Sequence, residues 1–255
     1  RPVRLNFWRA LTDNDRGLAS LVPALERWIV PMYWRRATKK QKLHSLKFTV
    51  MADGSVLVTT LWNVRKVKDK AELYFNISPE GKLTVQYTVR PRRKMLRLGL
   101  EMGLSGKLQS AQYFAHGPYE NMPDRRQGSP MGIYESPILK LKHDYVKPQF
   151  NGNRCSTEWV QLTAADGSGI KVTAEGHAFN FSIWDYTAED LEGAMHINEL
   201  PQREDYTLNV DHYQSGAHFD FLGGSQDRQY LPKGKEYTQV FTIEALDVEK
   251  ETHEA

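Results

Sequence analysis

Apolar and polar residues alternate with a period of two along several short stretches of this chain, and this pattern constrains the fold more than any other feature. Strict alternation runs through residues 73–77, 83–89 and 206–210, and a looser form runs through residues 241–245. Alternate side chains of a β-strand point to opposite faces of its sheet, so each stretch has one face for a core and one for water. The sequence therefore predicts many half-buried strands.

Turn-forming residues separate these stretches. Glycine stands beside Asp, Pro, Ser or Lys at residues 52–55, 78–82, 165–169 and 232–235. Such clusters let the backbone reverse between neighbouring strands. Many short strands joined in this way are typical of an all-β, antiparallel β-sandwich, and the 255-residue length suits a large one. No change of composition divides the chain, so we expect a single domain over residues 1–255 with a frayed tail at 247–255.

Helical signals are few. Residues 23–29 have Pro in the first turn and apolar residues at helical spacing, and residues 187–192 begin with Thr followed by acidic residues. Proline is tolerated in a first turn, Thr is a good N-cap, and acidic groups suit the helix dipole there. Residues 116–132 lack periodicity, and the aromatic residues around them favour an ordered, functional loop over a disordered one.

Composition excludes several classes of function. The chain has 34 basic and 31 acidic residues, which does not suggest a nucleic-acid partner, and no apolar run is long enough for a membrane span. A single cysteine, Cys155, excludes an internal disulfide, and the histidines lack metal-ligand spacing, so we predict no metal site. Arg1 reads as a cut within a longer or processed polypeptide, and the cellular compartment is left open.

Four segments in order along the chain carry a family resemblance. They are NFWRALTDNDRG at residues 6–17, GPYENMPDR at 117–125, PQFNGNR at 148–154, and YTAEDLEGAMHINELP at 186–201. These segments resemble the C-terminal β-sandwich domain of the large multidomain β-galactosidases of glycoside hydrolase family 2. Leu11, Met122 and Phe150 replace residues that are usual in that family. Order and spacing match over nearly the whole chain.

The resemblance implies a galactose-mutarotase-like supersandwich with a non-catalytic role. It would shape the active-site mouth and support the assembly of a retaining enzyme that hydrolyses terminal β-D-galactosides. In that family the catalytic glutamates lie on a separate TIM-barrel domain, so no catalytic residue and no cofactor are expected in this chain. Divalent and monovalent cations would belong to other domains of the parent enzyme. The expected partners are those domains or a large subunit and a carbohydrate substrate, and homo-oligomers are compatible with this reading.

One family residue that faces the sugar is missing. The family supplies a Trp from a loop near the end of this domain, whereas this chain has Phe221 at the nearest position and Phe219 beside it. A phenyl ring still offers an apolar face to sugar C–H groups, but it lacks the indole N–H donor. Both Phe residues are equally compatible with core positions.

The matched segments also contain a set of polar residues that form a candidate cluster. Two interpretations compete for them: a groove that faces sugar or barrel, and a buried network that fixes long loops. Buried polar groups must be satisfied, and Arg with a carboxylate or Asn in a turn does this well, so we favour the structural interpretation. The residues are Asp15, Arg16, Glu120, Asn121, Asp124, Arg125, Asn151, Asn153 and Arg154.

A second hypothesis is a free-standing sugar-handling sandwich, either a carbohydrate-binding module or an aldose-1-epimerase-like mutarotase. Mutarotation needs a general acid and a general base beside the sugar ring. The local pairs that suit it are His116 with Glu120 and His196 with Glu199.

Membership of a larger enzyme further predicts apolar groups on one face of the sandwich, which other domains would cover. The large apolar side chains that are candidates for that face, or alternatively for the core, are Trp8, Trp28, Trp34 and Phe150.

Overall fold

The computed structural model describes residues 1–16, 30–93, 95–216 and 235–247. Strands dominate these ranges, and the predicted all-β class is confirmed. The strands are β1 (Arg4–Asn6), β2 (Lys42–Val50), β3 (Val56–Asn63), β4 (Ala71–Ile77), β5 (Leu83–Val89), β6 (Arg97–Ser105), β7 (Leu108–His116), β8 (Met131–Pro137), β9 (Arg154–Thr157), β10 (Trp159–Ala164), β11 (Gly169–Glu175), β12 (Phe179–Trp184), β13 (Asp205–Gln214) and β14 (Tyr237–Leu246).

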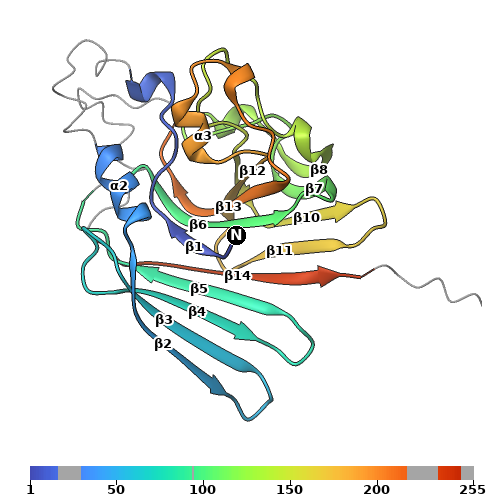
Figure 1. Cartoon of the computed structure of the whole chain (residues 1–255). Coiled ribbons are helices and arrows are strands. Elements are labelled where there is room, and N and C mark those ends of the chain that lie inside the picture. The colour runs from blue at the N-terminus through green and yellow to red at the C-terminus, as the bar shows by residue number, and fades with distance from the viewer. Residues whose placement is uncertain (17–29, 94, 217–234, 248–255) are drawn as a thin grey trace, which may run out of the picture.

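The strands form two antiparallel sheets that pack as layers (Figure 1). The smaller sheet has five strands in the order β1-β6-β13-β12-β9. The larger has nine in the order β2-β3-β4-β5-β14-β11-β10-β7-β8. All pairings between named strands are antiparallel, which confirms the predicted antiparallel sandwich.

Alternation predicted four of these strands well. The stretches at 73–77, 83–89, 206–210 and 241–245 lie within β4, β5, β13 and β14. In β5 Val85, Tyr87 and Val89 are buried, whereas Leu83 at its start and the threonines between are partly exposed, as a half-buried strand requires. The turn before β5 contains Gly81 at φ 85°, a conformation that side chains with a Cβ rarely adopt.

Aromatic and aliphatic side chains of both sheets meet in one core between the layers. Tyr113 of β7 lies edge-on to Phe181 of β12 with ring centroids 5.3 Å apart. Three of the aromatic candidates for an exposed face belong to the interior: Trp8 is 3% exposed, Trp34 is 1% and Phe150 is 2%. The core alternative therefore holds for these three residues and the exposed-face alternative does not, while Trp28 lies outside the described residues.

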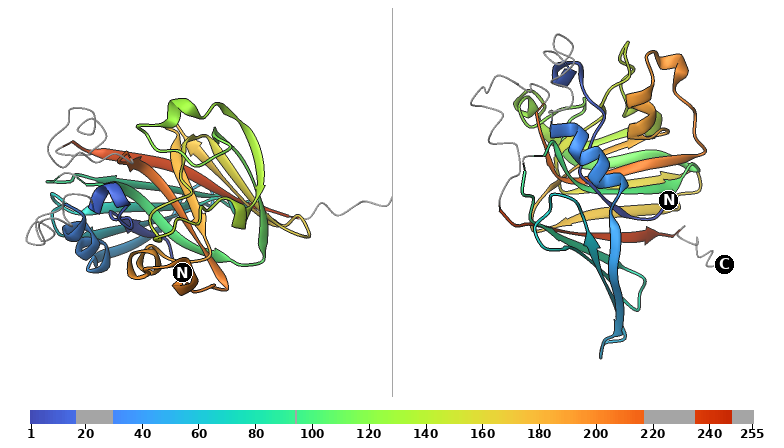
Figure 2. Two further views of the ribbon diagram at one scale, coloured as in Figure 1. Left: turned by 90° about the horizontal axis from the view of Figure 1, so that it is seen from above. Right: turned by 60° about the vertical axis from the view of Figure 1, so that its left-hand side comes forward.

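The strand order interleaves distant parts of the sequence. β14 lies between β5 and β11 in the larger sheet, although it follows every other described strand in the chain. Figure 2 shows β14 crossing the middle of the molecule, with the β2–β3 hairpin extending away from the body. The two halves of the larger sheet are therefore joined through β14.

Helices are short. α2 (Val30–Lys39) was not predicted, and the predicted helix at residues 23–29 lies outside the described residues. α3 (Ala188–Gly193) confirms the other predicted helix, and it begins with a capping box between Thr187 and Asp190. Three short 3-10 turns, η1 (Arg126–Gly128), η2 (Ile138–Lys140) and η3 (Ile197–Glu199), interrupt the connections. The long loop after β7 is ordered, as its aromatic surroundings predicted, but beyond Asp247 the predicted frayed tail lies outside the described ranges.

Candidate functional site

Three of the sequence motifs converge on one polar pocket of about 270 Å³. The start of the chain, the loop after β7 and the segment before β9 each contribute to its wall, although they are far apart in sequence. The lining residues are Thr12, Asp13, Asn14, Glu120, Asn121, Met122, Arg125, Tyr145, Gln149, Phe150, Asn151 and Asn153.

Glu120 is the central carboxylate of this pocket. One of its oxygens accepts hydrogen bonds from Arg125, at 3.0 Å, and from the hydroxyl of Tyr145. The other accepts the backbone N–H of Gly152 at 2.6 Å. Burial and the Glu120 carboxylate raise the pKa of Tyr145, which therefore keeps its proton and remains a donor. Through its two oxygens, Glu120 thus links Arg125 in the loop after β7, Tyr145, and Gly152 in the segment before β9.

Asn121 and Asn153 fasten the loop after β7 to the start of β9. The amide nitrogen of Asn121 donates to the carbonyls of His116 and Tyr119, and its oxygen accepts the N–H of Cys155 at 2.9 Å. The side chain of Asn153 donates to the Asn121 carbonyl at 2.9 Å. Each of these two asparagines is 1% exposed, so its polar side chain depends on these bonds rather than on water.

The side chains of Arg154 and Asn151 bind backbone groups of the neighbouring segments. The buried guanidinium of Arg154 donates to the carbonyls of Leu141, Gly152 and Pro118 at 2.6, 2.8 and 3.1 Å. Asn151 accepts the N–H of His143 and donates to the Gln149 carbonyl. Side chains rather than a sheet ladder thus support the backbone here.

Behind the pocket lies a fully buried ion pair. Arg9, 0% exposed, contacts Asp15 with 2.8 Å between Nη1 and Oδ2. Asp15 also accepts the N–H of Thr12 at 2.8 Å, while its own N–H donates to the Thr12 hydroxyl at 3.3 Å. This reciprocal arrangement is a capping box at the helical turn formed by residues 13–16. The guanidinium of Arg9 also lies over the ring of Phe150, 5.2 Å from its centroid.

The remaining cluster residues lie apart from the pocket wall. Arg16, at the end of the first motif, pairs with Glu192 of the fourth motif at 3.1 Å. Asp124 packs against Gly216, where a Cβ would come within 2.4 Å of its carboxyl carbon. Phe219 and Phe221 lie outside the described residues, so their role stays a prediction.

The two His–Glu pairs have other partners or open surroundings. Nδ1 of His116 lies 2.6 Å from the Ser129 carbonyl, which can only accept, so this nitrogen carries the proton. His196 and Glu199 form a 2.9 Å pair in which the His side chain is 68% exposed. Neither arrangement places an acid and a base around an enclosed space.

A second buried ion pair escaped the sequence analysis. Arg97 and Asp211, both 0% exposed, bind through two parallel bonds of 2.8 and 2.9 Å, and Gln214 donates to the same carboxylate. Burial raises the pKa of Asp211, against the opposing effect of Arg97. Arg97 is 114 positions from Asp211, and neither stands in a quoted motif, so no local signal could have paired them.

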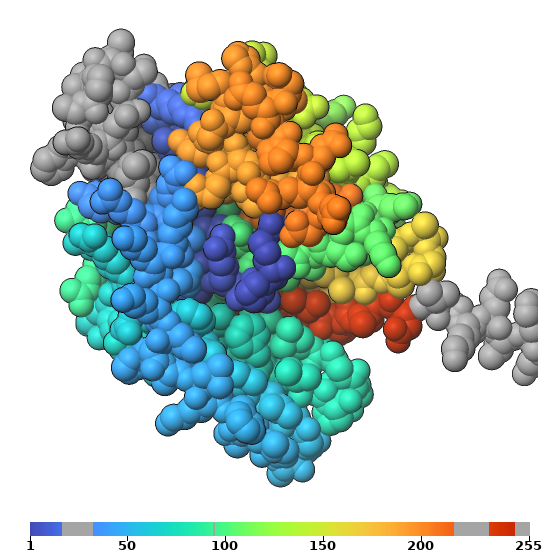
Figure 3. All heavy atoms as spheres, viewed as in Figure 1, coloured from blue at the N-terminus to red at the C-terminus, as the bar shows by residue number. Residues whose placement is uncertain are grey.

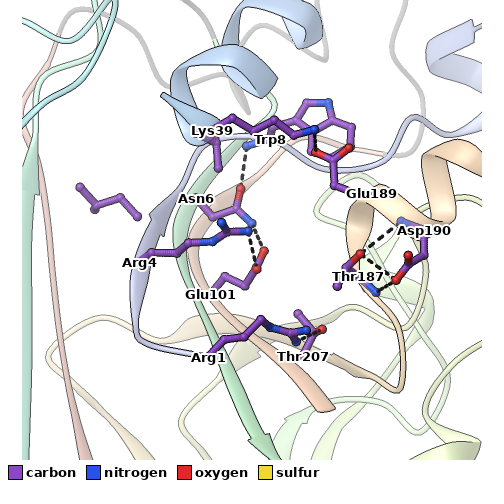
Figure 4. A network of polar contacts seen from close by, with 12 residues as sticks. Arg1, Arg4, Asn6, Trp8, Lys39, Glu101, Thr187, Glu189, Asp190 and Thr207 are labelled. Carbon is purple, nitrogen blue, oxygen red and sulfur yellow. Dashed lines mark hydrogen bonds and ion pairs between the residues drawn. The ribbon is translucent and has the colours of Figure 1, made fainter. Parts of the chain in front are cut away.

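A further network ties the start of the chain to the smaller sheet (Figure 4). The buried carboxylate of Glu101 accepts bonds from Arg4, at 2.9 Å, and from Asn6, at 2.8 Å. Asn6 in turn accepts the N–H of Trp8 at 3.1 Å. Asn6 opens the first motif, so this network fixes the point from which that motif approaches the pocket.

Chemically, the pocket is built from groups that are already engaged. Its carboxylates are Asp13, which exchanges two 2.9 Å bonds with Gln149, and Glu120. Burial raises the pKa of the Cys155 thiol behind the pocket to about 12, so it is not a nucleophile at neutral pH. Over the described ranges, no three His, Cys, Asp or Glu side chains gather as metal ligands, and no helix is long and apolar enough to cross a membrane.

Comparison with known proteins gives a consistent picture. A family model described as "Beta galactosidase small chain" matches residues 1–243. The chain is 35% identical over 204 residues to a β-galactosidase of Lactobacillus delbrueckii subsp. bulgaricus, covering 78% of this chain and 19% of that protein. It is 28% identical to a β-galactosidase of Halalkalibacterium halodurans, covering 93% of this chain and 24% of that protein.

Among solved structures, a galactose 1-epimerase from Lactobacillus acidophilus matches with a TM-score of 0.47 and 9% identity, over 80% of this chain and 67% of that one. The chain thus spans about a fifth to a quarter of the length of the two β-galactosidases that it matches.

Proposed function

Because the chain belongs to the β-galactosidase small-chain family, we propose that it is the non-catalytic β-sandwich part of a larger glycosidase that hydrolyses terminal β-D-galactosides with retention. The observation that carries this proposal is the family match over residues 1–243 in a chain that spans only 19–24% of the length of these relatives. The catalytic glutamates, and any divalent or monovalent cations, would belong to the remaining polypeptide.

The pocket supports this role. Retaining glycosidases use two carboxyl groups about 5–5.5 Å apart, one of which must be free to attack the sugar. Here Glu120 accepts hydrogen bonds from Arg125, Tyr145 and Gly152, and one oxygen of the Asp13 carboxylate accepts a bond from the Gln149 amide. These bonds suit a wall that holds loops in place beside an active site on another domain.

Two parts of this chain are proposed to face the sugar, namely the exposed edge of the pocket and one loop near the end of the sequence. Arg125 is half-exposed at the pocket and is a candidate for lining the groove. Phe221 or Phe219 would offer an apolar face to the sugar in place of the family Trp. Phe219 and Phe221 can each be replaced by Ala in the parent enzyme. Only the replacement of the residue that contacts the sugar should raise KM for galactosides.

The decisive experiment compares the isolated chain with the parent enzyme on a nitrophenyl β-galactoside. We expect turnover by the parent and none by the isolated chain. Turnover by the purified chain would refute the proposal. Catalysis of galactose mutarotation by the isolated chain, measured by polarimetry, would instead favour the epimerase-like alternative.

A further inference from the structure

β2 carries an uncovered apolar face at one edge of the larger sheet. Leu46, Phe48 and Val50 alternate with polar residues and are 55%, 70% and 66% exposed. Leu43 is 48% exposed, and a β-bulge between Leu43 and Ser45 separates it from the other three. Because a bulge adds one residue to the strand, Leu43 stays on the same face as Leu46. The local backbone thus keeps four apolar side chains of one strand on one side.

The register shows which side this is. Phe48 pairs with Val58, which pairs with Phe75, which pairs with Val85 of β5. Directly paired residues share a face of the sheet, and Val85 is 0% exposed in the core between the two sheets. The apolar face of β2 is therefore the inner face of the larger sheet, continued beyond the edge of the smaller sheet.

The exposed fraction rises along this row of paired residues, from β5 to β2, where the smaller sheet no longer covers the larger one. Val85 is fully buried, Val58 and Phe75 are partly exposed, and Phe48 is 70% exposed. On the neighbouring row Ile77 of β4 is still 43% exposed and Val50 is 66% exposed. Figures 1 and 3 show the β2–β3 hairpin projecting below the body of the molecule. A contiguous apolar face of this kind, made by neighbouring strands, marks an interaction surface.

We propose that this surface, made by Leu43, Leu46, Phe48, Val50 and Ile77, is the docking site for a segment of the parent polypeptide outside this chain. The proposal rests on the proposed function. The two relatives described above are four to five times as long as the matched region, since it covers 19% and 24% of them, so most of such an enzyme is available to cover the face.

Charge disfavours a second copy of this chain as the occupant. Residues 39–50 contain four lysines and no acidic residue. Two copies meeting through β2 would bring these basic segments together, and lysines on an edge strand are a known protection against such pairing. The occupant is therefore expected to be an apolar strand or loop of the parent with carboxylates at its margin.

The test compares hydroxyl-radical labelling of Phe48 in the isolated chain and in the full-length parent. Labelling follows exposed area, so we expect a fall of about fivefold or more in the parent. Phe48→Glu should lower the melting temperature of the parent, whereas it should leave that of the isolated chain within about 2 °C. Thr49→Glu, on the opposite face of the same strand, is the matched control and should leave the parent unchanged.

Equal labelling of Phe48 in both proteins would overturn the inference. So would protection that appears in the isolated chain as its concentration rises, with formation of a dimer, because a second copy would then be the occupant. Activity of the isolated chain on the nitrophenyl galactoside reports on the proposed function separately. An inactive chain with an unprotected Phe48 in the parent would therefore refute the docking site alone.

Discussion

Two arginine side chains are fully buried in ion pairs, and both lie over the ring of Phe150 in the wall of the polar pocket. Arg9 and Arg97 are both 0% exposed, and their carboxylate partners are Asp15 and Asp211. Exchange of such a pair for apolar groups is often neutral, but loss of one partner leaves an uncompensated charge in a low-dielectric interior. Single substitutions at these residues should therefore have unusually large effects on stability.

Asp15→Asn is expected to lower the free energy of unfolding by about 3–5 kcal/mol, because it leaves the Arg9 guanidinium without a counter-charge. Asp69→Asn is the matched control. Asp69 is 60% exposed in its pair with Arg90, so this change should cost less than about 1 kcal/mol. Urea unfolding of both variants measures the difference, and equal losses would show that burial of the Arg9 pair does not matter.

His212 should make stability depend on pH. Burial, with a smaller effect of His177, lowers its pKa from 6.5 to about 4. Between these values the unfolded chain binds a proton that the folded chain does not, so the free energy of unfolding falls as the pH is lowered from 6.5. One proton corresponds to about 1.4 kcal/mol per pH unit at most.

Urea unfolding between pH 6.5 and 5 checks this expectation. His212→Gln should flatten the slope, since it removes the group that titrates differently in the two states. An unchanged slope in the His212 variant would contradict the assignment.

Residue types in the motifs indicated polar groups worth attention, but not their partners. Asn121 and Arg154 were singled out from short segments, and the structure shows which carbonyls and N–H groups they satisfy. Tyr145, which binds Glu120, stands outside the motifs. Such contacts depend on how loops cross in space, which neither spacing nor propensity encodes.

At the scale of elements, substitutions in the loop after β7 can distinguish the two interpretations of the polar cluster, a structural network and a groove lining. Asn121→Ala would leave the carbonyls of His116 and Tyr119 and the N–H of Cys155 without their partner. A loss of at least about 2 kcal/mol in the free energy of unfolding is expected. Arg125→Ala should cost less than about 1 kcal/mol, because its side chain is 49% exposed.

Thermal unfolding of the isolated chain measures both effects, and kcat/KM of the parent enzyme completes the comparison. A loss of activity in Arg125→Ala at nearly unchanged stability would favour the groove-lining role for that residue. Unaltered stability in Asn121→Ala would argue that the loop is held by other contacts.

The positions of individual strands in the sequence were easier to predict than the order of the strands in each sheet. Alternation is local, so it located β5 at residues 83–89 and β4 around residues 73–77. β2 shows the same alternation at Leu46, Phe48 and Val50 but was not among the predicted strands, and its bulge interrupts the period only between Leu43 and Ser45. Strand order depends on crossovers between distant segments, which explains why the placement of β14 between β5 and β11 could not be foreseen.

For the whole molecule, β14 should decide whether the larger sheet forms. It is paired on both sides, with β5 through residues 83–89 and with β11 through residues 169–175. A chain that ends at residue 236 lacks this strand and would leave two separate sheet fragments with exposed core residues. We expect it to lose the cooperative unfolding transition, as followed by circular dichroism. A chain that ends at residue 247 keeps β14 and should retain the transition.

The central position of β14 also has a consequence for biosynthesis. A ribosome that adds about 5–20 residues per second needs roughly 7–30 s to pass from the end of β5, at residue 89, to the start of β14, at residue 237. Once β11 has been synthesised, at residue 175, the chain carries two half-sheets whose edges at β5 and β11 lack their partner until β14 follows. Chaperones that shield nascent polypeptides would have their greatest effect on yield in this window, and slower translation would lengthen it.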